Sequence, residues 1–234
     1  VSTLNSAEDK ELTPELFLEK VRKAPAKESW VIMPGEAIHR RAEKESEKSP
    51  IRLAIRFTPD RTLAQIYMNE NEAYIIGQPY SSGEKNTTII PELKCPPNQT
   101  VLANFGLRPE DLTLSFIYWN FVKELENTSV RGRNCRVFVL ADPDGKEKIN
   151  VCIDYEYFFP LKAEWIKNDI GKVASPYRTI EVTSFKKESD FWFVDGFVIY
   201  GPGWKTKINF SDVSAGFSSD GVPESLFIKT IENR

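Results

Sequence analysis

The chain has 234 residues, with 31 basic and 34 acidic side chains and a net charge of −3 at pH 7. Both signs are scattered along the sequence without a sustained basic stripe, which argues against nucleic acid as a partner. No apolar run approaches the roughly 18 to 20 residues that a transmembrane helix needs, and the length suits one antiparallel barrel or sandwich.

The first element along the chain is a helix preceded by a polar segment. Residues 1–11 begin at Val1 and read as a flexible leader. Removal of a signal segment is the simplest explanation, and a trimmed chain would look the same. A single domain is expected over residues 12–234. It opens with a helix over residues 13–23, because Thr13 is a suitable N-cap and proline at the next position needs no N–H partner there.

The middle of the chain predicts four strands, a long loop and a second helix. The strands are expected at residues 30–41, 51–58, 62–68 and 73–78. Residues 79–106 carry scattered Pro, Gly and Ser and predict an irregular loop. The second helix spans residues 109–119, is acidic at its start, and carries Leu112, Phe116 and Trp119 as its buried stripe.

Everything after this helix predicts antiparallel strands. They are expected at residues 121–127, 133–141, 148–156, 161–167, 178–187, 191–200 and 204–211. Eleven strands with turn-length gaps exclude a doubly wound α/β fold. The sequence therefore predicts a mainly β fold, a curved and half-open antiparallel barrel covered by two or three short helices. The tail at residues 221–227 is expected to dock back on the body.

The three cysteines fit no metal-ligand spacing. Cys135 and Cys152 lie on two strands joined by a turn at residues 142–145. Pairing Val137 with Val151 maximises apolar matches and leaves the two thiols on opposite faces, whereas a shift by one residue would bring the sulfurs together. A disulfide and two buried thiols both remain open.

No catalytic constellation accompanies the strands, so we expect no enzyme, no cofactor and no metal. His39 is the only histidine, lies among charged residues, and is expected to be an exposed residue at a strand end. Carboxylates such as Asp154, Glu156 and Glu181 occur on predicted strands, where edge-facing carboxylates are common.

Aromatic residues make up 12% of the chain and fit either a packed core or a cavity for an apolar ligand. Only two short helices are available to cover a wide sheet, which favours a cavity. The candidates for its lining or its lid are Leu112, Phe116, Trp119, Phe138, Trp165, Trp192, Trp204, Ile208 and Phe210.

Several short motifs occur in a fixed order between residues 107 and 227. They are LRPEDLTL at 107–114, CRVFVL at 135–140, VCID at 151–154, PLKAE at 160–164, GK at 171–172 and VPESLF at 222–227. In this order they resemble the outer-membrane lipoprotein-sorting proteins of the LolA-like superfamily. The resemblance implies a half-open barrel closed by helices, an apolar cavity for acyl chains, a periplasmic location and no catalytic residue.

These expectations lead to a carrier hypothesis and two alternatives. The first is a periplasmic carrier or sensor that binds lipid or the acyl chains of lipoproteins, a monomer with a possible envelope protein as partner, whose helix over residues 109–119 moves when ligand enters. The second is a structural or interaction module of the cell envelope, favoured by a cavity below roughly 300 Å³. A lipid hydrolase comes third and would need His39 in a cleft beside a hydroxyl or thiol.

Overall fold

The computed structural model describes residues 12–69, 71–80, 87–167, 175–188 and 191–228. The predicted leader at residues 1–11 and the Gly171-Lys172 motif lie outside these ranges. The described chain forms a 13-stranded antiparallel sheet in the order β5-β4-β3-β2-β1-β12-β11-β10-β9-β8-β7-β6, and β13 pairs with β1. Among the described residues, no helix is long and apolar enough to cross a membrane.

The strands are β1 (Ser29–Arg41), β2 (Glu47–Phe57), β3 (Arg61–Met68), β4 (Glu72–Pro79), β5 (Thr88–Leu93), β6 (Asn120–Val130), β7 (Arg133–Ala141), β8 (Lys148–Asp154), β9 (Pro160–Ile166), β10 (Pro176–Glu188), β11 (Phe191–Gly201), β12 (Trp204–Phe210) and β13 (Ser214–Phe217). The helices are α1 (Pro14–Arg22), α2 (Val101–Asn104) and α3 (Pro109–Thr113), with the 3₁₀ turns η2 (Pro97–Gln99), η3 (Ser115–Tyr118) and η4 (Ser218–Asp220).

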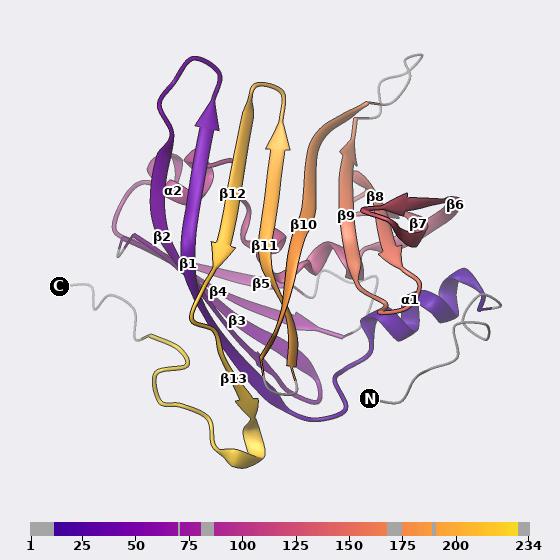
Figure 1. The fold of residues 1–234 in the computed structure, drawn as a ribbon, viewed down its shortest axis with the longest axis horizontal. Coiled ribbons are helices and arrows are strands. Elements are labelled where there is room, and N and C mark those ends of the chain that lie inside the picture. The colour runs from indigo at the N-terminus through magenta and orange to yellow at the C-terminus, as the bar shows by residue number, and fades with distance from the viewer. Residues whose placement is uncertain (1–11, 70, 81–86, 168–174, 189–190, 229–234) are drawn as a thin grey trace.

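The sheet bends into an open trough. In Figure 1, β3, β4 and β5 pass behind the plane of β12, β11 and β10, and β6, β7 and β8 turn away at the opposite side. Within the described residues the two ends of the strand path, β5 and β6, do not pair with each other, so the trough stays open. The prediction of a curved, half-open antiparallel barrel is confirmed.

All eleven predicted strands are present, and two more were missed. The predicted irregular loop at residues 79–106 is wrong, because its described part contains β5, η2 and α2. Strand β5 was not predicted because Pro91 interrupts its sequence and because its residues do not alternate between buried and exposed. Proline is tolerated there because β5 is an edge strand, whose outward N–H positions need no partner.

The single second helix predicted over residues 109–119 is also wrong. Helix α3 ends at Thr113, Leu114 adopts a left-handed conformation (φ 53°, ψ 30°), and η3 follows. A continuous helix buries one stripe. The break lets Leu112, Leu114 and Phe116 all be buried, although Leu114 would lie on the opposite side of a straight helix.

Helix α1 forms where the sequence predicts it, and it covers the β7 end of the trough. The Thr13 hydroxyl accepts a hydrogen bond from the Leu16 N–H at 3.3 Å. Phe17 is fully buried and stacks on Phe138, with ring centroids 5.5 Å apart. The guanidinium of Arg136 lies 4.6 Å from the centre of the Phe17 ring. The apolar stripe of the helix is therefore packed against the sheet.

Helix α2 and the C-terminal tail are fixed by buried polar contacts. The Glu72 carboxylate, on β4, accepts a hydrogen bond from the Leu102 N–H at 3.2 Å, where the helix N-terminus favours negative charge. In the tail, Leu226 is buried, and the Gln65 side chain exchanges two 2.8 Å hydrogen bonds with the backbone of Ile228. The predicted docking of the tail is confirmed.

The register between β7 and β8 differs by one residue from the one that maximises apolar matches. Val137 pairs with Cys152, and Phe138 pairs with Val151. This register prevails because Phe138 and Val151 belong together in the main core. Both thiols lie on the other face, buried with Val137 in a smaller apolar cluster, and they are free. The structure therefore has buried thiols and no Cys135–Cys152 disulfide.

Candidate functional site

An apolar cavity of about 290 Å³ lies between the concave face of the sheet and the α3–η3 segment. We call it the apolar cavity. Its sheet wall includes Val31, Met33, Leu53, Ile55 and Phe197, and its other wall includes Leu112, Leu114 and Ile117. Residues 158–160, the C-terminal end of α1 and residues 191–194 of β11 also line it.

The sheet wall follows from the alternation of strands β1 and β2. Val31 lies directly opposite Ile55, and Met33 lies opposite Leu53. Side chains two residues apart share a face, so these two pairs form one apolar patch on the concave side. All four are buried.

The lining carries very little charge. Among the described residues around the cavity, Lys23 is the charged one, and the polar members include Gln78, Tyr80 and Tyr118. The Gln78 amide donates to the Pro79 carbonyl at 2.8 Å. Burial raises the pKa of Tyr118 and of Tyr80, so both hydroxyls stay neutral. An occupant of this cavity would meet mostly hydrocarbon.

The α3–η3 segment is held from both sides. From α1, the Arg22 guanidinium donates to the carbonyls of Ile117 and Trp119, each at 2.7 Å, and burial lowers its pKa. From β10, Arg178 forms a bidentate ion pair with Asp111, whose side chain is 0% exposed. Arg22 therefore ties the segment at its end and Arg178 ties it at its start.

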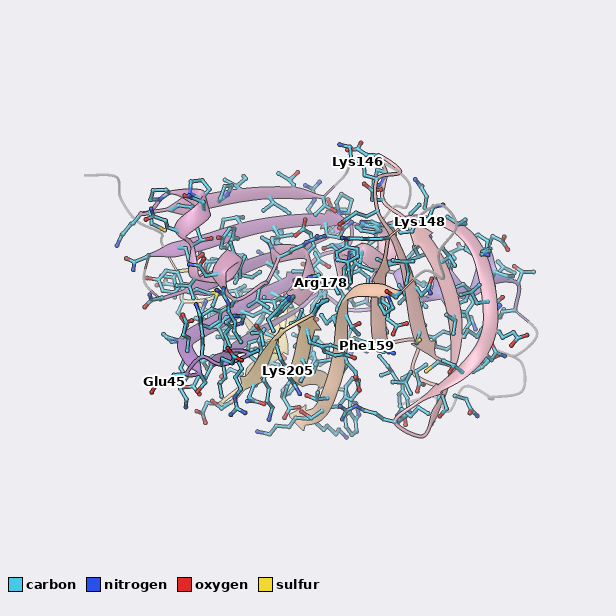
Figure 2. All side chains as sticks on the ribbon, turned by 90° about the horizontal axis from the view of Figure 1, so that it is seen from above. Glu45, Lys146, Lys148, Phe159, Arg178 and Lys205 are labelled. Carbon is cyan, nitrogen blue, oxygen red and sulfur yellow. The ribbon has the colours of Figure 1, made fainter. Side chains whose placement is uncertain are left out.

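The mouth of the cavity carries exposed aromatic residues. Trp192, on β11, lines the cavity and is 65% exposed. Its cross-strand partner is Lys187. Phe185, on β10, is also exposed and packs edge-on against Phe159, with ring centroids 5.4 Å apart. In Figure 2, Phe159 lies centrally, between the two halves of the trough.

The predicted site residues divide into three groups. Leu112 and Trp192 line the apolar cavity. Phe116, Trp119 and Trp165 line a second cavity on the other side of α3–η3. The others pack in the body of the protein: Phe138 under α1, Trp204 against Gly106, and Ile208 and Phe210 in the main core.

His39 is not the exposed residue that the sequence predicts. It is 2% exposed, its Nδ1 lies 2.8 Å from the Thr206 hydroxyl, and its Nε2 accepts a hydrogen bond from Arg41 at 2.9 Å. The Thr206 hydroxyl in turn donates to the Phe105 carbonyl. Burial, and then the Arg41 charge, lower the His39 pKa. These contacts join β1 and β12 to the end of α2, away from the cavity lining.

The candidate carboxylates have structural partners. Asp154 is buried, accepts hydrogen bonds from the backbone of Glu156 and Tyr157, and lies 3.1 Å from Arg133. Glu181 pairs with Arg131 at 2.6 Å. Neither Asp154 nor Glu181 lines the apolar cavity.

Sequence reasoning missed most of the sheet wall. Val31, Met33, Leu53 and Ile55 are ordinary strand residues, and no local feature of the sequence sets them apart from other core residues. The period-two alternation of residues 30–41 was the available signal. It did not indicate which face would be concave, since that depends on the bend of the whole sheet.

Comparisons with known proteins identify the fold. No protein-family model and no curated protein matches the chain. A DUF1329 family protein from Desulfovibrio piger has a similar structure, with a TM-score of 0.66 and 12% identity over 92% of this chain and 94% of that one. A putative outer membrane lipoprotein-sorting protein domain from Vibrio parahaemolyticus has a TM-score of 0.62 and 17% sequence identity. The match covers 94% of this chain and 96% of that one.

A LolA superfamily protein from Nitrosomonas europaea gives a TM-score of 0.54 and 12% identity, with 93% of this chain and 98% of that one covered. The similarity in each case extends over nearly the whole length of both chains. The protein has a LolA-like fold.

Proposed function

We propose that this LolA-like protein is a periplasmic carrier or sensor that binds lipid, or the acyl chains of lipoproteins, in the apolar cavity without catalysis. The observation that carries the proposal is the cavity itself, walled by aliphatic side chains of β1, β2 and the α3–η3 segment. Each buried methylene contributes about 0.8 kcal/mol, so an acyl chain can bind without polar contacts. The likeness to a lipoprotein-sorting domain supports the same function.

The cavity is too small to hold a long acyl chain unless a neighbouring segment moves. About 290 Å³ is just below the roughly 300 Å³ at which pockets for drug-sized ligands begin. A long acyl chain therefore requires the α3–η3 segment to move outward. That segment is short and is broken at Leu114, so its displacement disrupts few backbone hydrogen bonds.

A matched pair of substitutions tests the proposal. Val31 and Val139 are both buried, and Val31 lines the cavity whereas Val139 does not. Val31→Phe fills the cavity, and we expect it to weaken binding of a fluorescent fatty acid at least about tenfold. Val139→Phe is the control for overpacking, which costs about 1–3 kcal/mol of stability in either variant. Equal binding by both variants would remove the cavity as the site.

The same volume favours one alternative, a cell-envelope interaction module whose core is nearly filled. In that case neither variant changes any binding, because no lipid binds at physiological concentrations. The exposed Trp192 and Phe185 would then form part of the contact surface. Substituting Trp192→Ala would weaken capture of an envelope protein while leaving the folded protein intact.

A further inference from the structure

A second cavity, of about 330 Å³, lies on the opposite side of the α3–η3 segment. We call it the polar chamber. Its lining comprises Gln78, Thr87, Ile89, Arg108, Glu110, Asp111, Ser115, Phe116, Tyr118, Trp119, Asp142, Pro143, Asp144, Glu147 and Trp165. Gln78 and Tyr118 line this chamber and the apolar cavity alike, so these two side chains stand between the two spaces. In Figure 2, Lys146 marks the β7–β8 turn and Arg178 lies centrally.

The cations at the chamber are already paired. Arg108 donates to both carboxylate oxygens of Glu147, at 2.8 and 3.0 Å. Arg178 is bound to both oxygens of Asp111. In the part of the chain that the structure describes, no cation forms an ion pair with Glu110 or Asp142. Asp142 accepts a hydrogen bond from the Glu147 N–H at 2.9 Å. The chamber therefore has two carboxylates, Glu110 and Asp142, that are not held in ion pairs by the described residues.

Two buried polar atoms at the chamber lack partners among the described residues. They are the Glu110 Oε2, an acceptor, and the Trp165 Nε1–H, a donor. Trp165 is 2% exposed. A buried polar group without a partner is destabilising, and native proteins rarely retain one without a reason. A ligand that both donates and accepts hydrogen bonds would satisfy both atoms.

The remaining walls are aromatic. Phe116, Tyr118, Trp119 and Trp165 all contribute to the lining. Aromatic faces attract cations, and they attract them most strongly where water is excluded. Burial raises the pKa of Glu110 more than the nearby Arg108 and Arg178 charges lower it, and a bound ammonium group would stabilise the ionised carboxylate further.

We propose that the polar chamber binds the head group of an amphiphile whose tail occupies the apolar cavity, and that this head is a protonated amine beside a neutral oxygen, as in an amino alcohol or amino ester. The inference rests on the proposed function, since it requires a tail in the apolar cavity. The ammonium group donates to Glu110 and Asp142, and the oxygen accepts from Trp165. An anionic head is disfavoured by the carboxylates of Glu110 and Asp142, which no ion pair among the described residues occupies.

Three amphiphiles with the same tail test the head-group specificity: 2-aminododecan-1-ol, dodecan-1-ol and dodecanoate, titrated below their aggregation concentrations by calorimetry. We expect the amino alcohol to bind at least about tenfold more tightly than dodecanol, because a hydrogen bond to a charged group contributes more than a neutral one. Dodecanoate should bind most weakly of the three. Glu110→Gln keeps the shape of the side chain and should reduce the preference for the amine severalfold. Glu45→Gln, in an exposed turn (Figure 2), is the control.

The outcomes separate the two proposals. Tight binding of dodecanoate, or an amine preference that Glu110→Gln leaves unchanged, overturns the head-group assignment while the carrier function stands. Failure of all three compounds to bind overturns the carrier function, and the head-group assignment with it.

Discussion

The buried ion pair between Asp111 and Arg178 holds the start of α3 against the sheet. The two side chains are 0% and 5% exposed, and Arg178 also donates to the Gly106 carbonyl at 3.1 Å. The guanidinium lies 4.6 Å from the centre of the Trp165 ring, so it is enclosed on several sides. Loss of one partner would leave an uncompensated charge in the protein interior.

Asp111→Asn should therefore lower the free energy of unfolding by about 3–5 kcal/mol, the usual cost of breaking a buried pair. Urea unfolding followed by circular dichroism measures the difference. Glu45→Gln, which changes an exposed carboxylate, should have an effect below about 0.5 kcal/mol. A loss below about 1 kcal/mol for Asp111→Asn would mean that the pair is solvated.

His39 makes stability depend on pH. Because its pKa is lowered in the folded protein, the unfolded chain binds a proton more readily as pH falls below about 6.5. Stability is unaffected by His39 above that pH and decreases below it. The free energy of unfolding should fall more between pH 7 and 5 in the wild type than in His39→Gln. Parallel curves for the two proteins would contradict the buried position of His39.

The three cysteines should differ in reactivity. Burial raises the pKa of Cys135 to about 11 and that of Cys152 to about 12, whereas Cys95 is only partly buried. The thiolate is the reactive form. A thiol reagent at pH 8 should modify Cys95 alone in the folded protein and all three residues after unfolding. Rapid modification of Cys152 in the native state would show that its cluster opens readily.

At the scale of elements, the sequence predicts individual strands better than it predicts the covering segments. Strand β7 was predicted over the residues where it lies, since Val137 to Leu140 form a continuous apolar run between turn residues. The break at Leu114 has no local signal, because leucine is a good helix former and its left-handed conformation is fixed by burial of neighbouring side chains. The polar chamber was missed for a similar reason. Its residues lie on α3, η3, β4, β5, β9 and the β7–β8 turn, and only the bend of the sheet brings them together.

The α3–η3 segment should open more readily when Arg22 is replaced. Arg22→Met keeps an apolar side chain of similar length and removes the donors to the Ile117 and Trp119 carbonyls. We expect faster amide exchange over residues 115–119 and a higher association rate for a fatty acid. Arg40→Met, at an exposed position of β1, is the control.

Amide exchange also tests the predicted movement of the segment. Residues 109–119 of the wild type should lose protection when a lipid is bound, since an acyl chain replaces contacts that Leu112 and Ile117 make in the empty protein. Unchanged protection with confirmed binding would place the route of the ligand elsewhere.

At the scale of the whole molecule, the sheet is wide and open, yet its two edge strands are poorly suited to pair with strands of another molecule. Strand β5 ends the sheet on one side and contains Pro91. Strand β6 ends it on the other side, with irregular pairing between Phe121 and Lys123 and between Leu125 and Thr128. Prolines and bulges prevent edge-to-edge pairing. Both edges of the open trough therefore disfavour association with another strand.

Native mass spectrometry of the purified protein, before and after lipid extraction and then with added fatty acid or amphiphile, is the most direct test of lipid carriage. We expect one lipid per chain, lost on extraction and regained on addition, and we expect Val31→Phe to reduce the bound fraction. Absence of any bound lipid in all three samples, with the protein folded, would contradict it.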